Sequence, residues 1–386
     1  MHKSRPDPKQ LRVGVVGLGN IGRLHAGNVI EGRVERARVA ALCSRSPVDD
    51  LPEGAVHFTD YRELLESDAC DALVIATPTM DHAPMATAAL RAGLHVLVEK
   101  PLARSVREAQ AMIDGAGTLT VFGVILNQRL DGDFSAIRRI IRDGMLGELQ
   151  RVSWTMTQWY RPDVYFRVSE WRGTWRGEGG GALLNQCIHN IDVLQWLVGM
   201  PGAVTAQCAF GKYHDIEVED EVTAILEFGS ASGTLVASTG EVPGINQLDL
   251  VGDLATLRYD GGEITLFVNE PGAREHSRST SEMFGSPETT RSVVKPDPQV
   301  EQHATILQNF VDAVVDGTPL IAPAQEGLNS LAVANAMLLS SWTGERVALP
   351  LDADRYEAEL QKRIDASELR KPEQVDVVVD MSKSFR

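Results

Sequence analysis

The chain has 386 residues, is 43% hydrophobic and carries a net charge of −16 at pH 7, which predicts a globular protein of roughly two to three domains. The acidic balance argues against a nucleic-acid partner and an anionic membrane surface, because both select clustered Lys and Arg. No apolar run reaches the roughly 20 residues that span a bilayer, and residues 1–10 lack the apolar core of a signal peptide, so we expect a cytoplasmic protein.

The sequence begins with a strand, a glycine-rich turn and a helix. An apolar run over residues 11–16 predicts the strand, and a helical pattern covers residues 21–29. The turn has GxGxxG spacing, in which glycines permit a tight turn, close approach of a pyrophosphate and close packing of helix on strand. The helix start also offers free N–H donors. We therefore predict a dinucleotide site that includes Gly17, Gly19, Asn20, Ile21 and Gly22.

A second strand over residues 39–43 ends where NAD sites place an acidic residue, about 20 residues beyond the glycines. Here the chain has Ser44 and Arg45. No carboxylate repels a 2′-phosphate, and a hydroxyl beside a guanidinium can bind one, so NADP is favoured over NAD. Asp49 and Asp50 come too late to be secure substitutes.

Strands and helices then alternate. We expect helices over residues 61–66, 83–92 and 104–113, and strands over 72–76, 95–98 and 120–126. This alternation predicts a doubly wound parallel sheet of the Rossmann type, in a domain of residues 1–127. Ligands collect outside the carboxyl ends of such strands. Lys100 stands at one of these ends, although a Glu-Lys pair that closes a strand can also be a solvated edge.

After residue 127 the pattern predicts an α+β domain of residues 128–386. A helix over 134–142 precedes strands over 150–159, 222–228, 233–238, 247–251 and 256–259, which predict a large, mostly antiparallel sheet. A broad apolar free face on such a sheet usually meets another subunit, so we expect a homo-oligomer, dimer or tetramer. Residues 271–298 are polar and predict an exposed excursion, helices are expected over 303–315 and 323–342, and residues 375–379 suit an arm that pairs with a neighbour.

A helix predicted over residues 182–198 places Asn185, His189 and Asp192 on one face, by i, i+4, i+7 spacing. The alternative is a structural histidine satisfied by Asn185. Tryptophan and arginine side chains lie upstream of this helix. An indole ring can cover the apolar face of a pyranose, and a guanidinium group can donate hydrogen bonds to hydroxyl or anionic oxygens. The substrate candidates there are Trp171, Arg172 and Trp175, with Tyr160 and Arg161 as weaker ones, unless this stretch only anchors an interface or lid.

Three motifs together resemble the glucose-fructose oxidoreductase and inositol dehydrogenase (Gfo/Idh/MocA) family: the glycine turn with His25 behind it, Ala76-Thr77-Pro78 with His82, and Glu99-Lys100-Pro101. The resemblance implies that Lys100 lies beside the nicotinamide and the substrate hydroxyl and that Pro101 is cis. It also implies a catalytic His189, four residues after a position where the family has aspartate and this chain has Asn185. An amide can orient a neighbour but cannot hold a negative charge. The further cofactor contacts that we expect on this basis are Thr77, Pro78, His82, Glu99, Lys100 and Asn127.

Oxidation of a secondary alcohol needs a base for the hydroxyl proton, and the nicotinamide takes the hydride. His189 has an ordinary pKa of about 6.5, whereas the pKa of Lys100, ordinarily about 10.4, must be lowered. We therefore expect His189 to act as base, Lys100 to donate to the alkoxide and Asn185 to position them. All three are expected to contact substrate.

The sequence thus predicts an NAD(P)-dependent oxidoreductase of a sugar, glycoside (including C3 of a pyranoside) or cyclitol. One alternative is a nucleotide-sugar dehydrogenase, with Arg172 or Arg176 on phosphate. Another is a dinucleotide-binding sensor without turnover. Cys43, Cys70, Cys187 and Cys208 lack CxxC spacing, so we expect no disulfide and no metal site.

Overall fold

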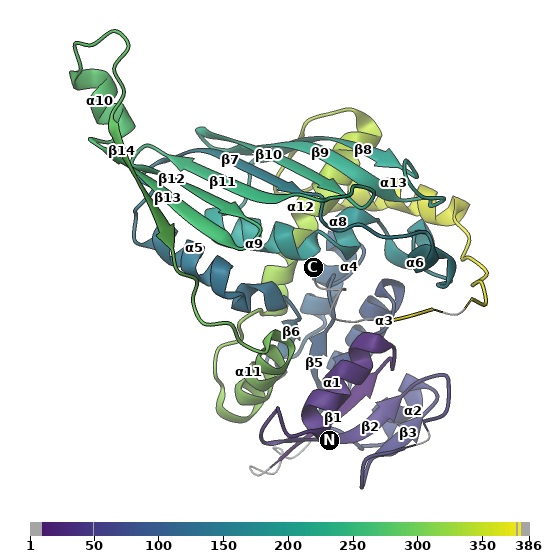
Figure 1. The fold of residues 1–386 in the computed structure, drawn as a ribbon. Coiled ribbons are helices and arrows are strands. Elements are labelled where there is room, and N and C mark those ends of the chain that lie inside the picture. Colours follow the sequence, from purple (N-terminus) through teal and green to yellow (C-terminus); the bar gives the residue numbers. More distant parts are fainter. Residues whose placement is uncertain (1–9, 49, 376, 380–386) are drawn as a thin grey trace.

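The computed structural model describes residues 10–48, 50–375 and 377–379, and two separate sheets organise them (Figure 1). The first sheet is parallel, with the order β3-β2-β1-β4-β5-β6. Its strands are β1 Leu11–Val16, β2 Ala37–Cys43, β3 Val56–Phe58, β4 Ala72–Ile75, β5 His95–Val98 and β6 Phe122–Val124. The strand order reverses between β1 and β4, and this switch point opens a crevice at the carboxyl ends of the strands. The predicted Rossmann-type sheet is confirmed.

The helices of this half connect the parallel strands. They are α1 Asn20–Ile30, α2 Tyr61–Glu66, α3 Thr79–Arg91 and α4 Val106–Asp114. Helix α3 begins four residues before the predicted start, because Pro78 serves as its N-cap with extended backbone. All six parallel strands precede residue 128, and the strands described below follow it.

The second sheet has the order β14-β13-β12-β11-β7-β10-β9-β8-β15 in the described residues. Only β7 and β10 pair in parallel; the other neighbours are antiparallel, as predicted. The strands are β7 Leu149–Met156, β8 Ala203–Phe210, β9 Glu219–Phe228, β10 Ala231–Ser238, β11 Asn246–Gly252, β12 Ala255–Asp260, β13 Glu263–Glu270, β14 Glu288–Val294 and β15 Val347–Ala348.

Most helices of the second half lie on one face of this sheet or join it to the first half, whereas the helix Ala273–Ser279 (α10) projects beyond its edge (Figure 1). The helices of this half are a 3-10 helix Asn127–Leu130, α5 Gly132–Arg142, α6 Val164–Arg167, α7 Trp175–Glu178, α8 Ala182–Asn185, α9 Ile188–Val198, α10 Ala273–Ser279, α11 Gln302–Asp316, α12 Ala324–Thr343 and α13 Ala353–Ala366. Helix α12 packs on β8 and α9 and also reaches α4. None of the helices described is long and apolar enough to cross a membrane.

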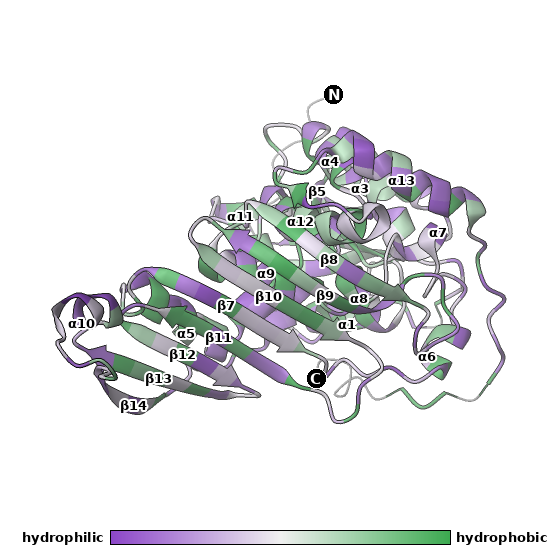
Figure 2. Cartoon of the chain, turned by 90° about the horizontal axis from the view of Figure 1, so that it is seen from above, coloured by the Kyte–Doolittle hydropathy of each residue, from purple (hydrophilic) through white to green (hydrophobic). Residues whose placement is uncertain are grey.

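The nine-stranded sheet buries one face and exposes the other. Leu226 and Leu235 are fully buried, whereas Thr223 and Thr234, respectively three positions and one position away on the same strands, are exposed. Hydrophilic and hydrophobic positions mix along these strands in Figure 2. The expectation of a broad apolar free face is therefore wrong, because threonine, serine and arginine occupy most outward positions near the centre of the sheet.

Two further expectations need correction. The excursion at residues 271–298 is exposed, as predicted, but it contains α10 and the edge strand β14, which project from one end of the molecule (Figure 1). The helix predicted over 182–198 is two helices, because the Cys187 N–H bonds to the Ala182 carbonyl five residues back, in a π-type turn. In the predicted arm at 375–379, residue 376 lies outside the described residues, and its described neighbours form no strand.

Candidate active site

The glycine turn after β1 has the shape of a phosphate cradle. Gly17 has φ +90, and an added Cβ would lie 2.6 Å from the Ala76 carbonyl oxygen. An added Cβ on Gly22 would lie 1.8 Å from the Gly17 carbonyl oxygen, whereas one on Gly19 would meet nothing within 4 Å. Two glycines are thus required by packing, and the third leaves open space at the start of α1, where Asn20 and Ile21 have unbonded N–H groups to offer. These residues fit a dinucleotide pyrophosphate.

Thr77 and Pro78 follow β4, the strand beside β1, and so lie at the same edge of the sheet. The Thr77 hydroxyl oxygen is buried and has no hydrogen-bond partner among the described residues. Asn127, also buried, donates to the side chain of Gln302 at 2.8 Å. An orphaned hydroxyl beside the glycine turn agrees with a polar ligand in the crevice.

The end of β2 carries Ser44 and Arg45. The Ser44 hydroxyl donates to the Ser46 carbonyl at 2.7 Å and lies 3.1 Å from His57 Nε2, a neighbour that the sequence did not indicate. Arg45 is exposed, and its guanidinium lies 3.4 Å from the Glu170 carboxylate of the other half. Both side chains remain available to a ribose or its phosphate.

Glu99 and His82 support the loops of the crevice from behind. Glu99 lies 2.8 Å from His25 Nε2 and also accepts the Lys100 N–H at 3.1 Å. Burial raises the pKa of Glu99, but the hydrogen bond and charge of His25 outweigh it and bring the pKa to about 2. His82 joins the Thr77 and Pro101 carbonyls, each at 2.9 Å. Because the side chains of Glu99 and His82 are both buried and hydrogen-bonded within the protein, we assign them supporting roles in place of the expected cofactor contacts.

Lys100 connects the two halves of the molecule. It follows β5, its peptide bond to Pro101 is cis as the resemblance implied, and its Nζ donates to the Asn185 carbonyl at 2.7 Å. Burial lowers the pKa of Lys100, and the positive charges of Arg161 and Arg172 lower it further, against the raising effects of Glu99 and Glu178. The amine is therefore easier to deprotonate than an ordinary lysine.

His189 lies in the first turn of α9, where its Nδ1 is buried and has no hydrogen-bond partner among the described residues. Burial and the nearby charge of Lys100 lower the pKa of His189 to about 3. The sequence-based expectation of a pKa near the working pH is thus not met, because the ring is desolvated. Asn185 does not satisfy this ring: its amide donates to Glu178 and, at 3.2 Å, to the Tyr165 hydroxyl.

Asp192 has a structural partner. It forms a buried ion pair with Arg129 at 2.7 Å. The π-type turn lies between Asn185 of α8 and His189 of α9, so the i, i+4 spacing predicted for these two residues is lost, whereas His189 and Asp192 remain three residues apart on α9.

The segment between β7 and α8 supplies residues that sequence reasoning missed. Glu178 is buried beside Asn185, and Tyr165 contacts both the Asn185 amide and the guanidinium of Arg172, which lies 4.2 Å from the Tyr165 ring. Arg172 also lies 5.0 Å from the Trp171 ring, and its Nε is buried without a partner in the described chain. The only sequence signal for Glu178 is its position directly before the glycine run 179–181.

Trp175 and Arg176 lie away from this group. The Trp175 ring is 5.5 Å from Trp342 and 5.8 Å from Phe210, inside the core. The Arg176 side chain donates to the Ile364 carbonyl of α13. We therefore no longer expect Trp175 or Arg176 to contact substrate or phosphate, whereas Trp171 and Arg172 remain candidates for substrate contact. Tyr160 also remains a candidate, and it is 47% exposed.

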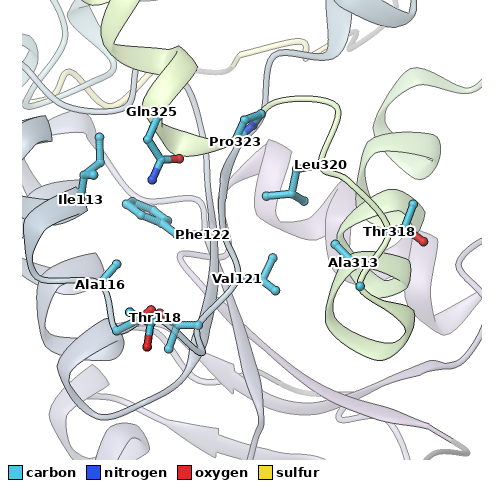
Figure 3. A pocket seen from close by; sticks show the side chains of 13 residues that line it. Ile113, Ala116, Thr118, Val121, Phe122, Ala313, Thr318, Leu320, Pro323 and Gln325 are labelled. Atoms are coloured by element: carbon cyan, nitrogen blue, oxygen red, sulfur yellow. Dashed lines mark hydrogen bonds between the residues drawn. The ribbon is translucent and has the colours of Figure 1, made fainter.

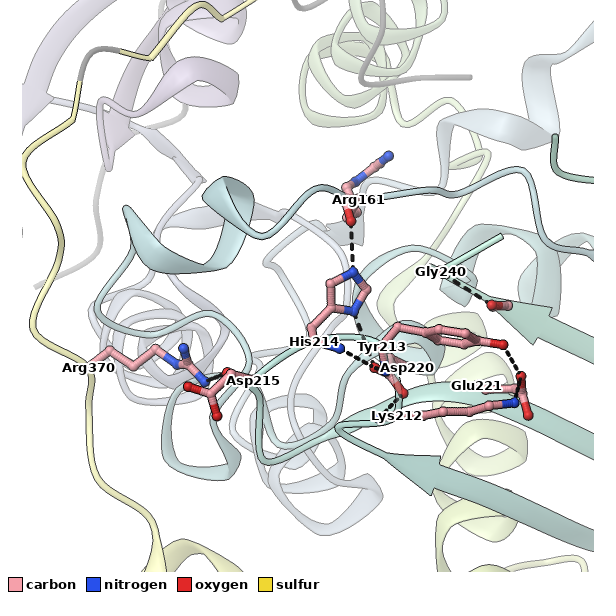
Figure 4. Close-up of polar contacts among 10 residues, drawn as sticks. Arg161, Lys212, Tyr213, His214, Asp215, Asp220, Glu221, Gly240 and Arg370 are labelled. Carbon is pink, nitrogen blue, oxygen red and sulfur yellow. Dashed lines mark hydrogen bonds and ion pairs between the residues drawn. The ribbon is translucent and has the colours of Figure 1, made fainter. Parts of the chain in front are cut away.

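Figure 4 shows how the chain beside the rim is held. His214 Nε2 lies 2.8 Å from the Arg161 carbonyl oxygen, and its Nδ1 lies 3.2 Å from Asp220, which also accepts three backbone N–H groups. Arg370 of the C-terminal segment donates to the Asp215 carbonyl. Long-range contacts of this kind fix an irregular segment that has little regular structure of its own.

A cavity of about 480 Å³ lies elsewhere, between the ends of α4 and α11, the strand β6 and the start of α12 (Figure 3). Ile113, Phe122, Leu320 and Gln325 are among its lining residues, and no charged side chain lines it. Within the described ranges, no group of three or more His, Cys, Asp or Glu residues could hold a metal ion. The crevice at Lys100 therefore remains the candidate site.

A dinucleotide cradle with an amine and an imidazole at its crevice defines a Rossmann-fold oxidoreductase. Comparison with known families agrees in both halves. Residues 11–124 match the oxidoreductase family with NAD-binding Rossmann fold, and residues 134–258 match the GFO/IDH/MocA C-terminal domain. The chain therefore belongs to the Gfo/Idh/MocA family of NAD(P)-dependent oxidoreductases.

Similar proteins cover nearly the whole chain. The scyllo-inositol 2-dehydrogenase (NADP(+)) IolW of Bacillus subtilis is 26% identical, over 88% of this chain and 96% of that protein. The inositol 2-dehydrogenase of Rhizobium meliloti is 27% identical, over 86% and 96%. Among solved structures, the WlbA dehydrogenase of Bordetella pertussis, in complex with NADH and UDP-GlcNAcA, has a TM-score of 0.74 at 27% identity and covers 89% of this chain and 100% of that one.

Proposed function

We propose that this oxidoreductase interconverts a secondary alcohol and a ketone on a cyclitol, sugar or glycoside. The observation that carries the proposal is the contact of Lys100 Nζ with the Asn185 carbonyl, which brings the amine of one half to the end of α8, just before the helix that carries His189, and the Lys100 charge acts on that ring. Two polar nitrogens then share the crevice of the glycine cradle. The inositol dehydrogenases among the similar proteins support a polyol substrate. A sensor without turnover would need neither side chain.

The chain's own residues divide the proton chemistry. The bound cofactor would take up the hydride from the carbinol carbon. The neutral imidazole of His189 accepts the hydroxyl proton, and Lys100 Nζ donates a hydrogen bond to the oxygen as negative charge develops. The low pKa of His189 disfavours a retained proton, and the lowered pKa of Lys100 suits its amine to act as the relay that passes this proton to solvent.

NADP remains the favoured cofactor in this proposal, with NAD as the alternative. Ser44 and Arg45 end β2 without a carboxylate at that position, which suits a 2′-phosphate. One similar protein is NADP-dependent by name, whereas the solved WlbA complex contains NADH.

A nucleotide-sugar substrate is the second candidate, and one observation favours it. The guanidinium of Arg172 lies at the rim on the Tyr165 ring, and its Nε has no partner in the described chain. A diphosphate oxygen would satisfy that donor. The oxidised carbon, including C3 of a pyranoside, stays open in either case.

The proposal is tested by screening cyclitols, pyranosides and UDP-sugars with both cofactors, followed through nicotinamide absorbance. Turnover of a cyclitol or free glycoside supports the first candidate, and turnover of UDP-sugars alone supports the second. Cofactor binding without turnover of any of these compounds would contradict both. Lys100→Met is the matched inactive control.

We also propose a homo-oligomer, in which the face of the large sheet that none of the described helices covers meets a second copy of the chain. The outward face of β7, β9 and β10 is the surface concerned. Sedimentation equilibrium of the wild type and of Ile225→Asp, at an exposed position of β9, tests it: a shift toward monomer is expected, and a monomeric wild type would contradict it.

A further inference from the structure

Glu178 is a carboxylate buried in the wall of the candidate site, with 3% of its surface exposed. One of its oxygens accepts a hydrogen bond from the Asn185 side-chain amide, and the other accepts the Gly173 N–H at 2.5 Å. Both neighbours are donors, so each bond is strongest when Glu178 is ionised. A buried group with this arrangement is sensitive to its own charge state.

Asn185 links this carboxylate to Lys100. Its side-chain amide contacts Glu178, and its backbone carbonyl accepts the hydrogen bond from Lys100 Nζ at 2.7 Å. A rearrangement of Asn185 after loss of the Glu178 charge therefore also moves the oxygen that holds the amine. The single turn of α8 ends at Asn185, so little regular structure resists this movement.

The charges that face Glu178 come from several elements. The positive charges of Lys100, after β5, and Arg172, before α7, favour the ionised form of Glu178. The carboxylate of Glu219, on β9, repels the charge of Glu178 and opposes that form. The net effect of burial is to raise the pKa of Glu178 to about 7. In turn, ionised Glu178 raises the pKa of Lys100, on which Arg161 and Arg172 act in the opposite direction.

We propose that Glu178 is a positioning residue of the reaction: through Asn185 it holds the Lys100 amine in place, and through its charge it sets how readily that amine releases a proton. This inference rests on the role proposed above for Lys100. Protonation of Glu178 below pH 7 weakens its hold on Asn185 and, through Asn185, on the Lys100 amine, so the reaction acquires an acidic limb that belongs to this carboxylate and not to His189.

Glu178→Gln tests the inference, with Glu219→Gln as its matched control. The control is also a buried carboxylate with a pKa raised by burial to about 7. Its Oε1 accepts the Gly181 and Leu183 N–H groups, and its Oε2 has no hydrogen-bond partner among the residues that the structure describes, so glutamine preserves its bonds. Glu178→Gln should lower kcat at pH 8 by about tenfold or more, the equivalent of one pKa unit, and remove the limb near pH 7. Glu219→Gln should keep the limb and move it to lower pH.

A second variant keeps the test open if Glu178→Gln does not fold. The double change Glu178→Gln, Asn185→Asp transfers the carboxylate to the other side of the same hydrogen bond. It should show an acidic limb and part of the wild-type kcat, and a double variant that folds but shows no acidic limb would contradict the inference. Cofactor KM should stay near the wild-type value in each variant, because the glycine cradle is untouched.

A readout without turnover separates this inference from the proposed function. Competitive acylation of Lys100 by acetic anhydride, quantified by peptide mass spectrometry across pH, reports the titration of the amine. Glu178→Gln should shift that titration to lower pH even if no substrate is found. An unchanged Lys100 titration, together with a retained limb near pH 7, would overturn the role of Glu178.

Discussion

The parallel-sheet half and the antiparallel-sheet half place their polar groups by different means. In the first half, the glycine turn, Thr77 and Lys100 follow consecutive or adjacent strands, so regular hydrogen bonding sets their positions. In the second half, the groups come from short helices and loops between residues 159 and 189. Buried carboxylates such as Glu178 and Glu219 hold those segments. Sheet topology therefore positions the polar groups of the first half, whereas hydrogen bonds to buried carboxylates position those of the second.

Replacement of Lys100 by Met is expected to have the largest effect, because it removes the amine that the first half brings to the Asn185 carbonyl of the second. We expect kcat to fall by about 10³-fold, within the range for acid–base groups, while cofactor binding measured by fluorescence titration is unchanged. Lys212→Met, at an exposed site, is the control and should retain activity. Undiminished turnover of Lys100→Met would remove the basis of the proposal.

His189→Asn should lower kcat by about 10²-fold, the lower range for a proton acceptor. Because the pKa of His189 is lowered to about 3, its imidazole is neutral throughout the working range. The variant should therefore keep any acidic limb near pH 7 in its pH–rate profile. Loss of that limb would show that His189 titrates there and that desolvation has less influence on the ring than the structure indicates.

Glu219→Gln tests how much stability the second half loses when the buried Glu219 carboxyl ionises. Burial raises the pKa of Glu219 to about 7, above its ordinary 4.5, so the folded state binds this proton more tightly than the unfolded state. Wild-type stability should fall as pH rises between about 4.5 and 7, by an amount on the order of 3 kcal/mol from this group. The variant lacks that loss, so its free energy of unfolding relative to wild type should increase from pH 5 to pH 8 in urea titrations. A constant difference would contradict the raised pKa.

Ser44→Asp is expected to have the smallest effect, confined to the first half. A carboxylate at the end of β2 repels a 2′-phosphate and accepts the ribose hydroxyls of NAD, so the ratio of kcat/KM for NADP over NAD should fall by about tenfold. Steady-state kinetics with both cofactors measures it, and Ser46→Asp, two residues on, is the control. An unchanged ratio would place the cofactor specificity elsewhere.

The same contrast explains what the sequence could predict. The glycine turn, the strand before Lys100 and the alternation up to residue 124 are local patterns, and the structure confirms the sheet that they predict. Strand β8 was not predicted from the sequence, because its run Ala203–Phe210 contains alanine, threonine and glutamine without a clear alternation of polar and apolar residues. The break before Ile188 and the burial of Trp175 depend on contacts with distant segments, which spacing alone does not encode.

Glu178 illustrates the limit most clearly. Nothing adjacent in sequence marks it as buried, and its partner Asn185 reaches it only because α7 and α8 fold back around the glycine run. The low pKa of His189 has the same origin, since burial and the Lys100 charge both come from the assembled site.

The central claim, that Lys100 and His189 meet over one carbinol, is tested most directly by a crystal structure with nicotinamide cofactor and the best substrate of the screen. We predict that Lys100 Nζ and a ring nitrogen of His189 both lie within about 3 Å of the same substrate hydroxyl oxygen. A substrate hydroxyl reached by neither nitrogen, or a His189 ring turned away from the crevice, would contradict the account.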